Sequence, residues 1–227
     1  MEGCDLYARA MIRAEDGERT ISMDEMTGVQ ALERTHPDLP MQPGHVLRRE
    51  FEYKRHGTLT CFLNLDVATG QVIATSCGKT RTEGDGLAHF QQLIASDPKA
   101  LKWHVIMDNL NIHQSEALVC WIAEMEGVSK EAVGVKGKSG HLKSMETRAT
   151  FLHDPTHKIV FYYTPKHASW MNQVEIWLSI LVRKLLKRGN FCSIEDLRDQ
   201  ILAFIAYYNR TMAKPIKWAY TGLKQNA

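Results

Sequence analysis

The order of apolar runs along this chain constrains its fold more than any other feature of the sequence. A hairpin comes first, with TLTCFLNLDV and VIATSC on either side of the turn ATGQ, and apolar runs then alternate with stretches of helical periodicity. The expected strands cover residues 21–27, 58–67, 72–77, 103–108 and 159–164. The expected helices cover residues 84–96, 113–126, 170–188 and 194–208. This order predicts an α/β fold in which a mixed sheet carries helices on both faces.

Composition excludes several classes of protein but leaves the function open. The 227 residues are 44% hydrophobic and 24% charged, which is ordinary for a globular protein with a substantial core. The net charge of +2 neither requires nor excludes a nucleic-acid partner, because clustering of charge matters more than its sum. Five cysteines without a CxxC pair argue against a disulfide framework and a structural zinc site. The odd number of widely spaced cysteines favours a reducing cytoplasm. No apolar run approaches the roughly 20 residues of a membrane span.

Two segments depart from the alternating pattern. Residues 127–158 contain GVKGKSGHLKS, where glycine and lysine interleave and large apolar residues are few. We expect this segment to be an insertion that is partly flexible and exposed to solvent. Residues 1–20 precede the first expected strand and are polar, so we interpret them as a linker. Residues 21–227 then form one domain that contains the insertion.

Three acidic residues occupy positions that suit a metal-dependent nuclease. Asp24 lies in the first expected strand, Asp108 ends the apolar run WHVIMD, and Glu175 lies in the expected helix 170–188. Acids placed in this way can converge at one edge of a sheet. Carboxylate oxygens are the ligands that Mg²⁺ prefers, and two such ions about 3.5–4 Å apart can activate a nucleophile and stabilise a leaving oxygen. The sequence therefore predicts catalytic metal ligands at Asp24, Asp108 and Glu175.

Each of these acids also has a structural interpretation. Asp24 could be a solvated strand residue, Asp108 could cap the next helix, and Glu175 could lie on the surface beside an apolar stripe. Glu25 must point to the opposite face of its strand from Asp24, so we expect only one of the two to join the site. The joint placement of the three acids favours the catalytic interpretation.

Several segments together resemble the catalytic core of bacterial insertion-sequence transposases of the mariner superfamily. They cover nearly the whole chain from about Leu6 onward, and they are SMDEMTGVQALERTHP, YKRHGTLT, LNLDVATGQV, IMDNLNIH, YYTPKHASWMNQVEIW and YYNRTMAKPIKW. The resemblance implies a ribonuclease H-like fold, which has the order of elements described above. It also implies that Asp24, Asp108 and Glu175 are the DDE-type acids, that they bind two Mg²⁺ or Mn²⁺ ions, and that the domain cleaves transposon ends and transfers strands into target DNA, commonly at a TA dinucleotide.

The resemblance further implies partners for the chain. Family members carry an N-terminal helix-turn-helix region that binds the terminal inverted repeats, and they usually act as dimers. We expect residues 1–20 to be the remnant of a linker to such a region, and a separate helix-turn-helix polypeptide to recognise the ends. The expected partners are DNA and a second copy of the chain, in a bacterial cytoplasm and at the nucleoid when bound to DNA. Asp108 and Glu175 are 67 positions apart, which is more than is common in the family, and the insertion at 127–158 accounts for most of the excess.

Other basic and polar residues are candidates for nucleic-acid contacts. Lys166 and His167 follow the last expected strand, close in sequence to Glu175, and could contact the scissile phosphate. Asn172 lies three residues before Glu175 and could orient a metal ligand or a water. Further candidates precede the hairpin or lie in the insertion: Lys54, Arg55, Lys136, Lys138 and Lys143. For each of these residues, a solvated surface position is the alternative.

Two more groups of residues have a favoured structural interpretation. Asn109 and His113 follow Asp108, but a lone histidine is more often structural than functional. A basic cluster at the end of the helix that carries Glu175 is expected to stabilise the negative helix end rather than to contact DNA, and it comprises Arg183, Lys184, Lys187 and Arg188.

The leading hypothesis is therefore the catalytic domain of a DNA transposase. One alternative keeps the fold and changes the substrate: a ribonuclease H-like nuclease that acts on RNA–DNA hybrids or branched DNA. The other alternative is a non-catalytic, DNA-binding remnant of a transposase. Metal-dependent cleavage distinguishes the remnant from both enzymes, and the preferred substrate distinguishes the two enzymes.

Overall fold

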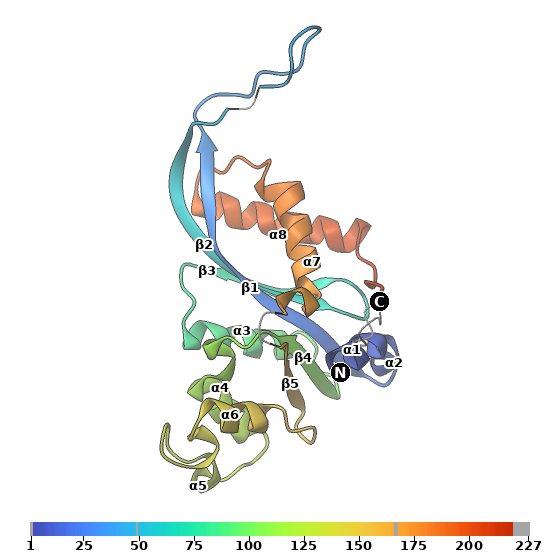
Figure 1. Ribbon diagram of the computed structural model, residues 1–227, viewed down its shortest axis with the longest axis vertical. Helices are drawn as coiled ribbons and strands as arrows, with labels where there is room; N and C mark the ends of the chain where they lie inside the picture. Colours follow the sequence, from blue (N-terminus) through green and yellow to red (C-terminus); the bar gives the residue numbers. More distant parts are fainter. Residues whose placement is uncertain (1, 49, 166–167, 220–227) are drawn as a thin grey trace, which may run out of the picture.

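A five-stranded mixed sheet lies at the centre of the molecule, with strand order β3-β2-β1-β4-β5 (Figure 1). Its strands are β1 (Glu18–Arg34), β2 (Tyr53–Asp66), β3 (Val72–Gly78), β4 (Lys102–Met107) and β5 (Ile159–Tyr163). β1 and β3 are antiparallel to β2, whereas β4 is parallel to both β1 and β5. This computed structural model describes residues 2–48, 50–165 and 168–219.

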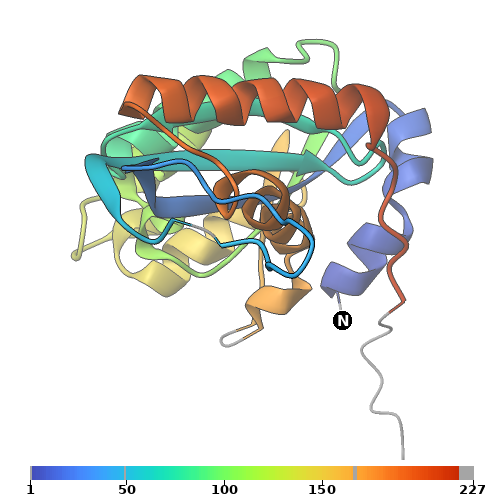
Figure 2. The same cartoon turned by 90° about the horizontal axis from the view of Figure 1, so that it is seen from above.

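Helices cover both faces of this sheet, as the sequence predicts (Figure 2). One face packs against α3 (Glu83–Ala95), α4 (Glu116–Met125) and α6 (Met145–Leu152). The other face packs against α7 (Val174–Leu181), a π-helical turn η4 (Val182–Leu186) that continues α7, and α8 (Ile194–Thr211). The described residues also form α1 (Glu2–Ala8), α2 (Ala10–Glu15) and α5 (Lys130–Val133), and three 3₁₀ turns, η1 (Asn111–Gln114), η2 (Gly140–Leu142) and η3 (Ser169–Met171).

The alternation of side chains along the strands creates two hydrophobic cores. On β2, Phe62 contributes to the core beneath α3 and α4, whereas its neighbour Leu63 contributes to the core beneath α7 and α8. Trp103 is the largest buried side chain of the first core, and Trp177 is the largest of the second. The sheet is therefore buried on both faces, which fixes the face to which each strand residue points.

Side-chain caps encoded in the sequence fix where the main helices begin. Thr82 and Asp85 form a reciprocal capping box at the start of α3. At α8 only half of such a box forms. Ser193 Oγ accepts from the Asp196 amide at 3.0 Å, while the Asp196 carboxylate accepts from the amide of Cys192 instead of that of Ser193. The boundaries of α3 and α8 agree closely with those expected.

The segment 127–158 is folded, which corrects the expectation of a partly flexible insertion. Leu142, which lies within the glycine-rich stretch, and Phe151 and Leu152 on α6 are buried in the first core. The buried guanidinium of Arg148 donates to the backbone oxygens of Gln114 and Leu142, at 3.3 and 3.4 Å. A few large apolar residues are sufficient here because these three side chains are buried. The number of apolar residues was therefore a poor guide, since their positions decide whether the segment packs.

Residues 2–15 form two helices, although we expected a linker there. Leu6, Tyr7 and Ala10 are buried against Val67 and Ile106 at the sheet. The Tyr7 ring also stacks on Trp218, with 4.7 Å between ring centroids. The first and last described segments of the chain are thus packed side by side (Figure 2).

β1 and β2 extend far beyond the rest of the sheet, and residues 35–52 between them project as an arm (Figure 1). β1 is much longer than the expected 21–27 because Val29 and Ala31 pack in the second core and keep the strand in place past a register shift. In the part of the chain that the structure describes, no helix is long and apolar enough to cross a membrane.

Candidate active site

The three predicted acids meet at one cavity. Asp24 lies on β1, Asp108 directly follows β4, and Glu175 lies in the first turn of α7. β1 and β4 are parallel neighbours with Ser22 opposite Ile106, so the same register two residues later sets Asp24 beside Asp108. All three acids line a cavity of about 640 Å³. The structure therefore brings together residues that lie far apart in the sequence, as predicted.

The cavity concentrates negative charge around Asp24. Burial raises the pKa of the Asp24 carboxyl to about 7, and the nearby charges of Glu175, Glu25 and Asp108 raise it further, while a hydrogen bond from the Glu25 amide opposes the shift. Repulsion among these carboxylates favours the binding of a cation between them. A divalent cation, bound through carboxylate oxygens, suits such a site.

His113 lies between the carboxylates of Asp108 and Glu25, and Glu25 points to the opposite face of β1 from Asp24. Its Nδ1 lies 2.9 Å from Asp108 Oδ1, and its Nε2 lies 3.0 Å from Glu25 Oε2. Glu25 Oε1 also pairs with Arg81 at 3.2 Å. Burial lowers the pKa of His113, but the hydrogen bonds to Asp108 and Glu25 outweigh burial and raise the pKa to about 10, so the ring is an imidazolium that donates from both nitrogens. The same contact lowers the pKa of Asp108.

Glu25 and His113 both contribute to the site, although the sequence indicated a minor role for each. Glu25 does point to the opposite face from Asp24, as expected, yet it reaches the site through His113 and lines the same cavity. The available signal was a second acid directly after Asp24 together with a histidine five residues after Asp108. Only the fold shows that the two side chains touch, because they come from different elements.

Asn172 holds Asp24 and is not available to a nucleic acid. It is completely buried, and its Nδ2 donates to the Met23 carbonyl at 2.8 Å and lies 3.5 Å from Asp24 Oδ2. Its Oδ1 accepts from Ser22 Oγ, which in turn accepts from the Val174 amide at 2.8 Å. This network joins the start of α7 to β1. Our expectation of a nucleic-acid contact at Asn172 is therefore wrong, whereas the interpretation that it orients a metal ligand is consistent with the contacts.

Of the other residues expected to contact nucleic acid, those that the structure describes do not line the acid cavity. Lys54 and Arg55 are exposed at the start of β2, and Lys138 and Lys143 are exposed in the segment after α5. Lys136 is paired with Glu116 at 3.4 Å and lies 4.0 Å from Glu83. Lys166 and His167 lie outside the described residues. Asn109, a weaker candidate, donates to the Thr164 carbonyl at 2.7 Å and has a structural role.

The donor chemistry of the cavity fits divalent metal ions, although the side chains do not form a finished coordination cage. Among the residues that the structure describes, no three His, Cys, Asp or Glu side chains are grouped tightly enough to hold an ion as they stand. Mg²⁺ commonly keeps several waters and takes only one or two carboxylates directly, so a loose group of carboxylates is compatible with it.

Comparison with known proteins agrees with this geometry. The sequence matches the model of a family described as DDE superfamily endonuclease over residues 19–198. No curated protein matches it. The fold is similar to the Mos1 strand transfer complex (TM-score 0.54, 11% identity, 90% of this chain and 52% of that chain). It is also similar to the Mos1 mariner paired end complex with Mn (TM-score 0.52, 12% identity, 90% and 54%).

These matches define the fold and the family. The chain spans about half the length of the Mos1 chains that it matches, and at such low identity the likeness concerns the fold alone. The expected ribonuclease H-like architecture is confirmed. Because the family model covers most of the sequence, including all three acids of the cavity, this chain belongs to the DDE superfamily of endonucleases.

Proposed function

We propose that this chain is the catalytic domain of a DNA transposase, which cleaves transposon ends and transfers strands into target DNA with Mg²⁺ or Mn²⁺. The observation that carries the proposal is the single cavity lined by Asp24, Asp108 and Glu175 in a DDE-family chain. The Mos1 structures with a similar fold are a paired end complex with Mn and a strand transfer complex, which supports both the metal and the substrate proposed here.

Each acid has a distinct support in the fold. Asp24, Asp108 and Glu175 would hold the ions, which when bound activate a water or 3′-hydroxyl and stabilise the leaving oxygen. Asn172 orients Asp24, and His113 orients Asp108 through its Nδ1. Glu175 is held at the first turn of α7, which Ser22 fixes to β1. The sheet and its side-chain network thus pre-organise the ligands, which is what metal-assisted phosphodiester chemistry requires.

Nicking of supercoiled DNA with Mn²⁺ tests this proposal. Asp108→Asn should abolish nicking, because the neutral amide removes a charged metal ligand, while circular dichroism should show an unchanged fold. The matched control is Asp199→Asn, which makes the same change on α8 at a side chain that is 65% exposed. The control should nick DNA at the wild-type rate. Full activity in Asp108→Asn contradicts the assignment.

The substrate distinguishes the two enzymes considered above. Preferred cleavage of duplex DNA that ends in inverted repeats supports the transposase, whereas preferred cleavage of an RNA–DNA hybrid supports a ribonuclease H-like nuclease. Absence of nicking together with unchanged Mn²⁺ binding after mutation of the three acids supports a non-catalytic remnant.

The proposal extends to partners and location. We infer a bacterial cytoplasmic protein that acts at the nucleoid, with transposon-end DNA and target DNA as substrates. A second copy of the chain and a separate helix-turn-helix polypeptide are the proposed protein partners. Co-purification of the chain with end DNA, followed by measurement of the mass of the complex, tests the stoichiometry.

A further inference from the structure

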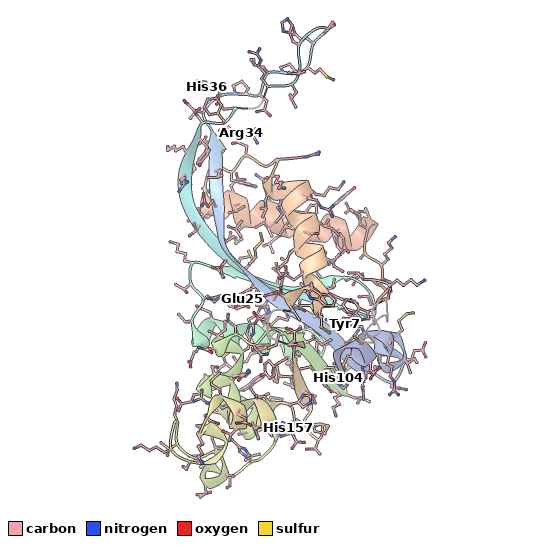
Figure 3. All side chains as sticks on the ribbon, viewed as in Figure 1. Tyr7, Glu25, Arg34, His36, His104 and His157 are labelled. Atoms are coloured by element: carbon pink, nitrogen blue, oxygen red, sulfur yellow. The ribbon has the colours of Figure 1, made fainter. Side chains whose placement is uncertain are left out.

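The acid cavity and two further cavities form a row that ends at the base of the arm. A second cavity of about 310 Å³ shares Arg183 with the acid cavity, and a third of about 430 Å³ shares Arg188 with the second. The third is also lined by Arg34 and His36, which Figure 3 labels at the base of the arm, while Glu25 is labelled at the other end of the row. Each cavity thus shares an arginine with the next, and the lining residues form one series from the acids to the base of the arm.

Four cations line these cavities, and we name them the basic track: Arg183, Lys184, Lys187 and Arg188. All four side chains are exposed. Arg183 and Lys187, like Lys184 and Arg188, are four residues apart and therefore neighbours along η4 and the turn after it. Leu185 and Leu186 are partly buried against the second core, so the helix cannot rotate the cations away from the cavities.

The side chains of the basic track are not needed as hydrogen-bond donors to the last carbonyls of the helix. The carbonyl of Val182 accepts from the Lys187 amide, and that of Leu185 accepts from the amides of Arg188 and Gly189. These last carbonyls are therefore satisfied by backbone groups. Of the four cations, only Arg183 has a side-chain hydrogen bond to the helix among the described residues: its Nε donates to the Ser179 carbonyl at 3.2 Å. Within the described part of the chain, none of the four cations is paired with a carboxylate.

A nucleic-acid strand is the partner that matches this arrangement. A line of exposed, unneutralised cations suits a polyanion whose charges repeat along a line, and neutralisation of phosphates by Arg and Lys dominates such binding. The track begins at the acid cavity, where Arg183 and Lys187 stand beside Glu175 and Asp24. A phosphodiester held at the acids therefore has neighbouring phosphates within reach of the track.

We propose that the DNA flanking the reacting phosphodiester leaves the acid cavity along the basic track, toward the base of the arm, with backbone phosphates on Arg183, Lys187 and Arg188. This inference rests on the proposed function. The proposed path runs from the acid cavity toward the arm and away from the segment after α5. The lysines of the segment after α5 lie at the opposite end of the long axis (Figure 1), and Lys136 there is neutralised by Glu116 and Glu83.

The salt dependence of DNA binding tests the path independently of cleavage. Fluorescence anisotropy of a labelled DNA duplex is measured against the full chain, with Ca²⁺ in place of Mg²⁺ to suppress nicking. Arg183→Gln combined with Lys187→Gln should lower the magnitude of the slope of log K against log salt by about 1.8, since each lost phosphate contact contributes about 0.9. The control, Lys99→Gln with Lys130→Gln, removes the same charge from exposed lysines that line none of the three cavities and should leave the slope unchanged.

The outcomes separate the path from the function. An unchanged slope in the Arg183/Lys187 variant, with a wild-type protein that still nicks DNA, overturns the path and leaves the proposed function standing. A slope that falls only when Lys138 and Lys143 are both changed to Gln also overturns it, because the DNA then runs to the opposite end. A wild-type chain that binds no DNA overturns the path and the function together.

Discussion

At the scale of single residues, Asn172 is the side chain that ties the catalytic helix to the catalytic strand. It contacts Met23 and Asp24 on β1 and accepts from Ser22, and it lies two residues before α7 begins. Polar groups this deeply buried are expensive to leave without a partner. Asn172 is therefore a positioning residue, and its removal should affect the site before it affects the rest of the fold.

We expect Asn172→Ala to lower the nicking rate by about 10–100-fold, the usual effect of removing a group that orients a metal ligand. Mn²⁺ affinity measured by calorimetry should fall with it, and excess Mn²⁺ should restore part of the rate because Asp24 remains. Gln91→Ala, which truncates an exposed amide on α3, is the control. Equal nicking rates and Mn²⁺ affinities in Asn172→Ala and wild type contradict the role.

A second residue, His89, sets a pH dependence of stability. It is 1% exposed and bonds to Ser76 and Asn64, and burial followed by repulsion from His113 lowers its pKa to about 3. In the unfolded chain the ring takes up a proton near pH 6.5, which the folded chain cannot do. Stability from this residue is therefore complete above about pH 6.5 and is lost as the pH falls toward 3.

Urea unfolding of wild type and His89→Asn at several pH values measures this effect. Between pH 6.5 and 5 the wild-type free energy of unfolding should fall by roughly 1–2 kcal/mol more than that of the variant, which lacks the titrating group. Parallel curves for the two proteins over this range show that His89 does not carry the dependence.

At the scale of elements, the β2–β3 hairpin brings two of the five cysteines together. Cys61 and Cys77 are directly opposite each other in the antiparallel register, and their sulfur atoms lie 2.8 Å apart. Facing residues of an antiparallel pair have Cα separations of about 4.5–5.5 Å, within the range that a disulfide spans. The hydrogen bond from Cys61 lowers the pKa of the Cys77 thiol, and the charge of Arg198 acts in the same direction.

Oxidised glutathione should therefore link β2 to β3 through a disulfide. The Cys77 thiolate attacks the glutathione disulfide and releases one glutathione, and Cys61 then displaces the second, so two protein thiols are oxidised and one disulfide is reduced. Mass spectrometry should show a Cys61–Cys77 cross-link and a chain lighter by two hydrogens. Cys77→Ser should lack the bridge. Recovery of Cys61 as a free, alkylated thiol after oxidation and unfolding contradicts the prediction.

At the scale of the whole molecule, three elements from different parts of the chain bring their carboxylates to one cavity. β1, the end of β4 and the start of α7 each bring one carboxylate to the acid cavity, and the raised pKa of Asp24 reflects their mutual repulsion after burial. An ion that binds the folded site and not the unfolded chain stabilises the fold by mass action.

Thermal unfolding should therefore shift with metal. Mn²⁺ at 100 times its dissociation constant should stabilise wild type by about 2.7 kcal/mol, and EDTA should remove the gain. The Asp108→Asn variant should show little or no shift, whereas Asp199→Asn should respond as wild type does. The same shift in wild type and Asp108→Asn places the metal elsewhere.

Local pattern was sufficient to predict the main strands and helices, because each depends on periodicity and on caps within a few residues. The apolar run before Asp108 and the helical spacing of apolar residues in 84–96 are examples. Pattern failed where distant packing decides the outcome. β1 is long because Val29 and Ala31 pack beneath α7 and α8, and the segment 127–158 folds because Leu142, Phe151 and Leu152 fill the first core.

The sequence alone determined the order of the elements along the chain and the positions of the three acids on them, since periodicity and side-chain alternation follow from local spacing. The tertiary structure alone decided which groups surround those acids. Asn172 contacts Met23, 149 positions away, and His113 contacts Glu25, 88 positions away. His113 also contacts Asp108, which is close in the sequence but follows a different element. Hydrogen bonds depend on the separation and orientation of two atoms, and for different elements that geometry exists only once the sheet and helices have packed.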